Sequence, residues 1–221
     1  MTKKRFLVIG LGRFGANVAR TLAKANCEVL GMDINEESVE QISKEIPHCV
    51  IADASKIDVL SELGAANVDH AVVAIGNNLE ASILTVVNLK RLGVTKITVR
   101  ADTEDYRRIF NLIGATEVVI PEEESAISLA YKIRSDAILG YYLLRNDYVM
   151  AQIKVSTSEL ESKTLKELDM RNRLNVNIIG ITRNGQFFIP SFNDTIVKGD
   201  IVAIVAKSDD VKKMVAYLGE N

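Results

Sequence analysis

The chain has 221 residues, of which 48% are hydrophobic and 25% are charged, and its formal net charge is −2. This length suits one large domain or two small ones, and the composition is that of an ordinary globular protein. The slightly acidic balance argues against a nucleic-acid-binding protein, which usually presents a basic surface. No apolar run approaches the ~20 residues that a membrane-spanning helix needs.

The start of the chain and its two cysteines predict a cytoplasmic protein. The first residues, MTKKRF, lead directly into a predicted strand, so we expect no signal peptide. Cys27 and Cys49 lie in or beside predicted strands and form no CxxC pair. We therefore expect buried, reduced thiols rather than a disulfide or a metal site.

Up to residue 120, short apolar runs alternate with helical segments. The runs are rich in β-branched residues, as expected for parallel strands that are covered on both faces. The predicted strands are Arg5–Ile9, Glu28–Asp33, Cys49–Ala52, His70–Ile75, Lys96–Arg100 and Glu117–Ile120. The predicted helices are Phe14–Ala25, Glu36–Glu45, Ile57–Leu63, Leu79–Leu92 and Glu104–Ile113. This alternation predicts an α/β domain with a Rossmann, doubly wound parallel sheet in the order 3-2-1-4-5-6.

Beyond Pro121 the pattern changes. A long crossover helix is predicted to run to about Leu139, so that residues 122–140 separate the first domain, residues 1–121, from a small α+β module over residues 141–221. In this module Asn184-Gly185 marks a hairpin turn. The elements expected there are strands at Tyr148–Val155, Val176–Thr182, Gln186–Ile189 and Asp200–Ala206, and helices at Thr164–Arg173 and Asp209–Leu218.

The first strand runs into a glycine-rich turn, in the sequence KRFLVIGLGRFG. Gly10 suits a tight turn, Gly12 lets the backbone approach a phosphate, and Gly15 lets the next helix pack on the strand. Phosphates would lie where that helix begins, near Phe14, because free N–H groups point outward there. Asp33, at the end of the second strand, can accept hydrogen bonds from ribose hydroxyls and disfavours a 2′-phosphate. The pattern predicts a nucleotide site, with a tight turn that holds no ligand as the alternative.

Two charged residues near this turn allow two interpretations each. Arg13 lies inside the glycine loop, where it would either pair bidentately with a terminal phosphate or remain a solvated arginine. Asp53 follows the third strand, with Ala54 and Ser55 behind it. This aspartate would either meet the adenine edge or cap the following helix.

The ends of the later strands add further candidates. Ile75 ends the fourth predicted strand, and Gly76-Asn77-Asn78 follow beside the switch point of the sheet, where they would contact a ligand or form an ordinary turn. Arg100 ends the fifth strand and Glu122 follows the sixth, so both are expected at the same sheet edge. A carboxylate near phosphates would suit a divalent cation between them.

Catalytic patterns are missing from the sequence beside this nucleotide signature. The two histidines, His48 and His70, each lie at the amino-terminal side of an early strand. The sequence has no Walker lysine, no zinc-cluster pattern and no Ser/His/Asp set. Hydride transfer needs an acid–base group over the nicotinamide, and only a lysine or a tyrosine could serve. We therefore expect a binding protein and not an enzyme.

Several segments together carry a more specific pattern: FLVIGLGRFG, MDINEESV, IADAS, VVAIGNN, VRAD and IPEEE, followed by SKTLKELDMRNRLNVNIIGI and FNDTIVKGDIVAIVA. They resemble the regulatory subunits of bacterial Ktr/Trk potassium-uptake systems, which contain RCK domains. The resemblance covers essentially the whole chain, and the single-copy architecture is more similar to the KtrA type than to the duplicated TrkA type. It implies an RCK N-lobe over residues 1–121, a dimerisation helix over residues 122–140 and an RCK C-lobe over residues 141–221.

The resemblance also implies a function. Such proteins are cytosolic nucleotide sensors that gate a membrane-embedded potassium channel subunit. Their homodimers assemble into an octameric ring under that subunit, so this chain would be peripherally associated with the inner face of the cell membrane. ATP would favour the activated ring and ADP the inactive one. NAD(H) remains an alternative ligand, because it would make the same ribose and pyrophosphate contacts as ATP or ADP.

Individual roles follow from the family motifs. Arg13 would read the terminal phosphate, and Asp53 would meet adenine. Asp33, with Asn35 nearby, would hold ribose. Glu122 would help to hold a divalent or monovalent cation between the nucleotides of a dimer. The complete set expected at the nucleotide is Gly10, Gly12, Arg13, Phe14, Gly15, Asp33, Ile34, Asn35, Asp53, Ala54, Ser55, Ile75, Gly76, Asn77, Asn78, Arg100 and Glu122.

Two positions depart from the family motifs or match them weakly. The family often has lysine where this chain has Arg100, and this difference keeps the positive charge at the position. In some members the C-terminal module binds cyclic di-AMP at its dimer interface, through an arginine and an asparagine six residues later. These match Arg171 and Asn177, although Asn177 also fits a plain strand position.

Two other functions are compatible with parts of the sequence. A small NAD(H)-dependent oxidoreductase is the main alternative, because the glycine turn and Asp33 allow it. An NADH-sensing transcription regulator would need a basic DNA-reading helix, and the sequence has neither that motif nor the charge. We therefore expect no nucleic-acid partner.

Overall fold

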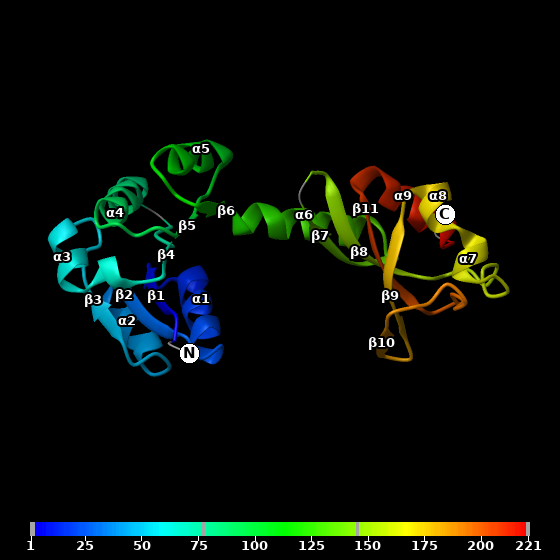
Figure 1. The fold of residues 1–221 in the computed structure, drawn as a ribbon, viewed down its shortest axis with the longest axis horizontal. Coiled ribbons are helices and arrows are strands. Elements are labelled where there is room, and N and C mark those ends of the chain that lie inside the picture. Colours follow the sequence, from blue (N-terminus) through cyan, green and yellow to red (C-terminus); the bar gives the residue numbers. More distant parts are fainter. Residues whose placement is uncertain (1–2, 77, 145, 220–221) are drawn as a thin grey trace. The chain divides into compact units, whose positions relative to one another are not determined.

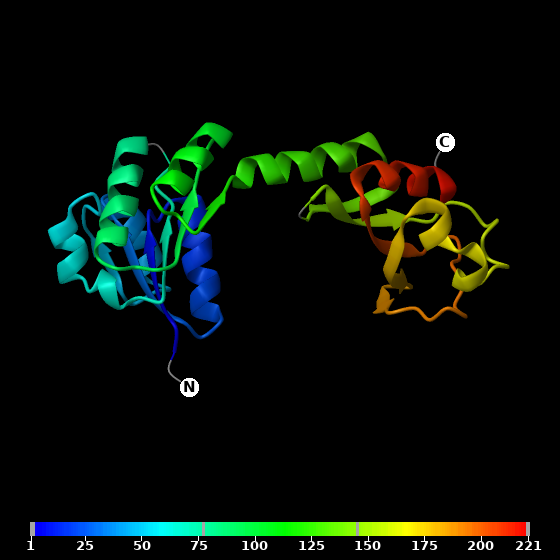
Figure 2. The ribbon, with the colours of Figure 1, turned by 45° about the horizontal axis from the view of Figure 1, so that its top comes forward.

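The computed structural model describes residues 3–76, 78–144 and 146–219. The chain forms two compact units, Met1–Pro121 and Glu122–Asn221, and each has its own hydrophobic core (Figures 1 and 2). Among the described residues, no helix has both the length and the apolar character that crossing a membrane requires.

The first unit is a parallel six-stranded sheet in the order β3-β2-β1-β4-β5-β6, so the predicted strand order is confirmed. Its strands are β1 (Arg5–Ile9), β2 (Glu28–Asp33), β3 (Cys49–Ile51), β4 (His70–Val73), β5 (Ile97–Arg100) and β6 (Glu117–Val119). Its helices are α1 (Arg13–Lys24), α2 (Glu36–Ser43), α3 (Ile57–Glu62), α4 (Leu79–Arg91) and α5 (Glu104–Leu112), with a short 3₁₀ turn at Ala65–Asn67. The predicted elements are therefore all present, with ends that shift by one or two residues.

Both faces of this sheet are covered, which explains why its strands read as apolar runs. Leu7 and Ile9 of β1 pack on one face, in a core that includes residues of α3, α4 and α5. Val8 points to the other face, where α1 and α2 supply the packing. The two cysteines are free and half-buried, less buried than the sequence predicts.

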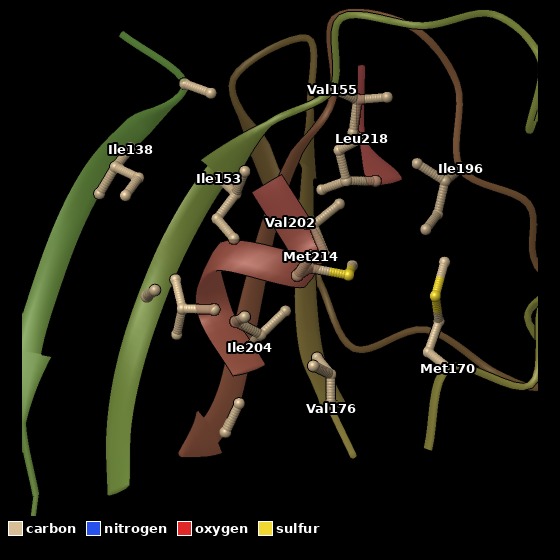
Figure 3. Packing of buried hydrophobic residues seen from close by; sticks show 14 of the residues in the cluster. Ile138, Ile153, Val155, Met170, Val176, Ile196, Val202, Ile204, Met214 and Leu218 are labelled. Atoms are coloured by element: carbon tan, nitrogen blue, oxygen red, sulfur yellow. The ribbon is translucent and has the colours of Figure 1, made fainter. Parts of the chain in front are cut away.

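The second unit is built on a five-stranded antiparallel sheet in the order β10-β9-β11-β8-β7. Its strands are β7 (Ile138–Leu143), β8 (Tyr148–Lys154), β9 (Asn177–Arg183), β10 (Gln186–Phe188) and β11 (Ile201–Lys207). Its helices are α6 (Pro121–Arg134), α7 (Leu165–Leu168), α8 (Met170–Leu174) and α9 (Ser208–Tyr217). Figure 3 shows isoleucine and valine side chains of the sheet meeting Met214 and Leu218 at the centre of the core.

The structure corrects two predictions in this unit. The helix expected to reach Leu139 ends at Arg134, and β7 begins at Ile138. Pairing with β8 buries Ile138 and Tyr141 to 6% and 1% exposure, so tertiary packing overrides the helical pattern. The single helix expected at Thr164–Arg173 is two short helices, because Asp169 between them adopts a left-handed conformation with φ +45°.

A pair of tyrosines fixes α6 to the second unit. The rings of Tyr131, in α6, and Tyr141, in β7, stack with centroids 3.8 Å apart. Both hydroxyls are hydrogen-bonded to Oγ of Ser208, at 3.1 and 2.8 Å. Burial raises the pKa of Tyr141 to about 12. The hydrogen bond from Ser208 instead lowers the pKa of Tyr131.

These pKa values predict how stability depends on pH. Between pH 10 and 12 an unfolded tyrosine has lost its proton, whereas folded Tyr141 keeps it. The stability contributed by Tyr141 is therefore fully present below pH 10 and falls above it, by up to about 1.4 kcal/mol per pH unit. Tyr131 does not contribute to this fall, since a lowered pKa in the folded state makes its own contribution to stability rise with pH. Urea unfolding followed by circular dichroism should show a shallower alkaline fall for Tyr141→Phe than for the wild type.

The control is Tyr142→Phe, which removes the hydroxyl of an adjacent tyrosine that is 49% exposed. This variant should keep the slope of the wild type. An equal slope in Tyr141→Phe would contradict the assignment.

Candidate nucleotide site

The glycine loop is held against the sheet by close backbone contacts. Gly10 follows β1 with φ +89°, a conformation that favours glycine, and its N–H donates to the carbonyl of Met32 at 2.8 Å. A Cβ on Gly10 would lie 2.7 Å from the carbonyl carbon of Ala74. A Cβ on Gly15 would lie 1.8 Å from the carbonyl oxygen of Gly10. The fold itself therefore requires glycine at both positions.

Gly12 differs from the other two glycines. Its φ of −64° and ψ of −171° are available to any residue, and, its two chain neighbours aside, none of the described residues has an atom within 4 Å of the position that a Cβ would take. Gly12 is the N-cap of α1, where first-turn N–H groups have no partner within the helix. A side chain would fill this open space. The space therefore fits a phosphate lying on the helix N-terminus.

Asp33 ties the glycine loop to the second strand. Its Oδ2 accepts a hydrogen bond from the N–H of Leu11 at 2.6 Å, and its Oδ1 accepts one from the N–H of Asn35 at 2.9 Å. The side chain of Asn35 in turn caps α2 by accepting from the N–H of Ser38. A carboxylate has about four acceptor positions, so Asp33 can still accept from a ribose hydroxyl. Ile34 beside it is 72% exposed.

Asp53 belongs to a hydrogen-bonded loop after β3. Its Oδ1 accepts from both the N–H and the hydroxyl of Ser55, at 3.0 and 2.6 Å, while Ala54 between them is buried. The Ser55 hydroxyl holds the pKa of this carboxyl below its usual value. The N-cap of α3 is Lys56, so the interpretation of Asp53 as a helix cap is wrong. The carboxylate of Asp53 is therefore favoured in its charged form, in which its oxygens can accept a hydrogen bond from a ligand.

The loop after β4 lies beside a pocket of about 310 Å³. Ile75 and Gly76 line this pocket with Arg100, and Asn78 caps α4 by accepting from the N–H of Ala81. Nη2 of Arg100 lies 3.2 Å from Oδ1 of Asp102, and Nη1 lies 2.7 Å from where a Cβ on Gly76 would be. The structure thus brings Arg100 to the predicted sheet edge.

Two predicted residues are not placed at this edge. Asn77 lies outside the described residues. Glu122 follows Pro121 in the first turn of α6 and belongs to the second unit. Its part in the nucleotide site stays a prediction.

The two histidines lie at the opposite end of the sheet, as the sequence predicts. His70 is the first residue of β4, and its Nε2 is 2.8 Å from Oγ1 of Thr98. Burial lowers the pKa of His70. His48 lines a separate pocket of about 300 Å³ together with Cys27. Neither imidazole is part of the glycine-loop site.

In the second unit, Arg171 and Asn177 line one pocket of about 390 Å³. Arg171 comes from α8. Asn177 is the first residue of β9, so it also occupies the ordinary strand position that was the second interpretation of this residue. Apolar side chains of Met170, Ile178 and Phe192 contribute to the same pocket. The structure therefore brings the two predicted residues together.

Sequence reasoning missed one polar contact of the candidate nucleotide site in the first unit. Nδ2 of Asn88, in α4, donates to the carbonyl oxygen of Ser55 at 2.8 Å. Asn88 is only 7% exposed. A polar residue at a helical position flanked by Val86, Val87 and Leu89 was the available signal, because buried amides are normally kept for a hydrogen bond.

Family comparisons agree with this architecture. Residues 6–121 match the TrkA-N domain, and residues 150–219 match the TrkA-C domain. The chain belongs to the TrkA-N/TrkA-C family. It is 38% identical over 212 residues to "Ktr system potassium uptake protein C" of Bacillus subtilis (strain 168), covering 96% of each chain. It is 33% identical over 211 residues to "Ktr system potassium uptake protein A" of the same strain, covering 95% of each chain.

A solved structure supports the fold of this TrkA-N/TrkA-C protein. The crystal structure of the GsuK RCK domain matches 99% of the chain with a TM-score of 0.66 and 17% identity. The match spans 48% of that chain's length. The identification as a regulatory RCK subunit of the Ktr/Trk class is thereby confirmed.

Substitution of Gly12 and of Gly15 should have different consequences. Gly12→Ala should fold normally, because its backbone angles are ordinary and its Cβ meets nothing. It should weaken ADP binding about tenfold, since the methyl group occupies the space expected for phosphate. Gly15→Ala should instead lower the melting temperature, because its Cβ overlaps a carbonyl oxygen. Calorimetric titration and thermal melting measure the two effects, and unchanged ADP affinity in Gly12→Ala would exclude a phosphate there.

Proposed function

We propose that this protein is a nucleotide-sensing regulatory subunit that binds ATP or ADP at its glycine loop and gates a membrane-embedded potassium channel subunit. The observation that carries the proposal is the open cradle at Gly12, at the start of α1, in a chain whose relatives are named as potassium uptake proteins. The gating work would come from different contacts with the two nucleotides, because a ligand shifts an equilibrium only by its differential affinity for the two states.

Arg13 is the residue best placed to supply that difference. It is exposed, and it is the first residue of α1, directly after Gly12. A guanidinium can pair bidentately with a phosphate that already lies on the helix N-terminus. Because ATP and ADP differ by one phosphate, such a pair with the terminal group would contribute roughly 1–3 kcal/mol of coupling.

The remaining contacts divide the nucleotide among the loops of the sheet edge. Asp33 would hold ribose, and Asp53 would meet adenine. A divalent or monovalent cation would lie between phosphate oxygens and Glu122, and the resemblance places that cation between the nucleotides of a homodimer. Carboxylate and phosphate oxygens suit a hard cation. Two adjacent acids, Glu123 and Glu124, share the first turn of α6.

The assembly follows from the same family. Homodimers would form an octameric ring, attached through the channel subunit to the inner face of the cell membrane. The protein would work in the cytoplasm, where ATP and ADP are available. Its output would be mechanical and not chemical, since no catalytic step is required of the site.

NAD(H) is the competing ligand. The pocket of about 310 Å³ beyond Gly76 has Phe110 and Tyr106 in its lining, and it could receive a second nucleoside. Calorimetric titration with ATP, ADP and NADH, each with and without magnesium or calcium, separates the two ligands. Tighter binding of adenosine phosphates and an effect of the cation would support the proposal. A preference for NADH would contradict it.

Arg13→Ala tests the phosphate-reading role. The variant should bind ADP nearly as well as the wild type and lose most of its distinction between ATP and ADP. The matched control is Arg20→Ala, on the same helix, where the arginine pairs with Glu45 at 2.7 Å. Affinities come from calorimetry, and gating comes from potassium flux in vesicles that contain the channel subunit. Unchanged discrimination in Arg13→Ala would exclude this role.

The pocket of the second unit is proposed to take cyclic di-AMP. Arg171 would pair with a phosphate, Asn177 would donate to the ligand, and the apolar lining would pack on a base. Arg171→Ala should weaken cyclic di-AMP binding at least tenfold in calorimetry. The control is Arg173→Ala, whose guanidinium lies 5.6 Å from the ring of Tyr217. Equal affinities of the two variants would contradict this site.

A further inference from the structure

Helix α4 carries an unusual number of buried polar side chains. Ser82, Thr85 and Asn88 are exposed by 2%, 0% and 7% and recur every third residue. Burying a polar group costs free energy unless it is hydrogen-bonded, and asparagine is a poorer helix former than leucine. Packing alone would favour apolar residues at these positions. At least some of these side chains are therefore retained for the hydrogen bonds that they make.

Two of the three hold loops of the nucleotide site. Oγ of Ser82 lies 2.9 Å from the carbonyl oxygen of Asn78 and 3.2 Å from that of Ile75, both in the segment that links β4 to α4. Nδ2 of Asn88 donates at 2.8 Å to the carbonyl of Ser55, in the loop after β3. Six residues of helix separate the two side chains by about 9 Å. In the strand order β3-β2-β1-β4, these loops lie on either side of the glycine loop, so one rigid helix sets their spacing.

The Asn88 contact continues to the carboxylate of Asp53. Ser55 accepts from Asn88 with its carbonyl, and it donates to Oδ1 of Asp53 with both its N–H and its hydroxyl. A rotation of the Ser55 backbone would disturb all three hydrogen bonds together. The direction of the Asp53 carboxylate therefore depends on the amide of Asn88, which lies 33 residues away from Ser55 in the chain.

We propose that Asn88 is a positioning residue that sets nucleobase selectivity by aiming Asp53, through Ser55, at the exocyclic amine of a 6-aminopurine. This inference rests on the proposed function, in which Asp53 meets adenine. A carboxylate accepts hydrogen bonds only, so it favours the amine of adenine, which is a donor. Removing the Asn88 donor leaves the Ser55 carbonyl unpaired and frees the loop to turn, while Asp53 itself is still present.

The test compares ADP with its analogue in which hydrogen replaces the adenine amine, using calorimetry on the full-length protein. Wild type should bind ADP more tightly than the analogue. Asn88→Leu, which keeps the branched shape of the side chain and is a good helix former, should reduce that ratio about fivefold to tenfold. Thr85→Val is the matched control. Its hydroxyl is buried on the same helix and has no hydrogen-bond partner among the described residues, so the ratio should stay that of the wild type.

Asp53→Ala completes a double-mutant cycle. If Asn88 acts through Asp53, Asn88→Leu should have no further effect on the ratio in the Asp53→Ala background. A merely structural role would lower the melting temperature and the affinity for both ligands, and it would leave their ratio unchanged.

Three outcomes would overturn the inference. An unchanged ratio in Asn88→Leu, or additive effects in the cycle, would overturn it while the proposed function stands. Equal affinity of the wild type for ADP and for the analogue without the amine would also overturn the inference and leave the proposed function standing. Failure of the wild type to bind any adenosine nucleotide would instead overturn the proposed function, and this inference with it.

Discussion

The nucleotide site depends on the close approach of Gly15 to the carbonyl of Gly10. This contact seats the start of α1 against the ends of β1, β2 and β4, where Gly10 also bonds to Met32 and the N–H of Ala74 bonds to Ile9. The helix N-terminus is thereby presented at the sheet edge with a free face at Gly12. Since neither glycine tolerates a side chain, the position of the α1 N-terminus at the sheet edge follows from packing within the chain.

Hydrogen bonds within the chain also organise the loops around this turn. Asp33 is held by two backbone N–H groups, and Asp53 is held by Ser55, which Asn88 holds in turn. Both carboxylates keep acceptor positions for a ligand. A site whose polar groups are already fixed loses less entropy on binding, and it discriminates better between ligands of similar shape.

The second unit has an independent core, and α6 is part of it. Tyr131 stacks on Tyr141 and shares Ser208 with it, so the helix that begins where the first unit ends is anchored in the second. The antiparallel sheet and α9 bury this anchor together with Met214 and Leu218. Each unit therefore has its own core and its own pocket, and α6 belongs to the core of the second unit.

The sequence by itself determined the features that depend on local spacing. The glycine turn and the alternation of strands and helices follow from residues close together in the chain, and the order of the parallel sheet follows from the general topology of doubly wound folds, so they could be predicted. The tertiary structure decided what depends on distant partners. Residues 138–143 form the strand β7 because β8, with which they pair, lies beside them. Asn88 gained a role in the site because folding brings its amide to Ser55, across 33 residues that no local pattern spans.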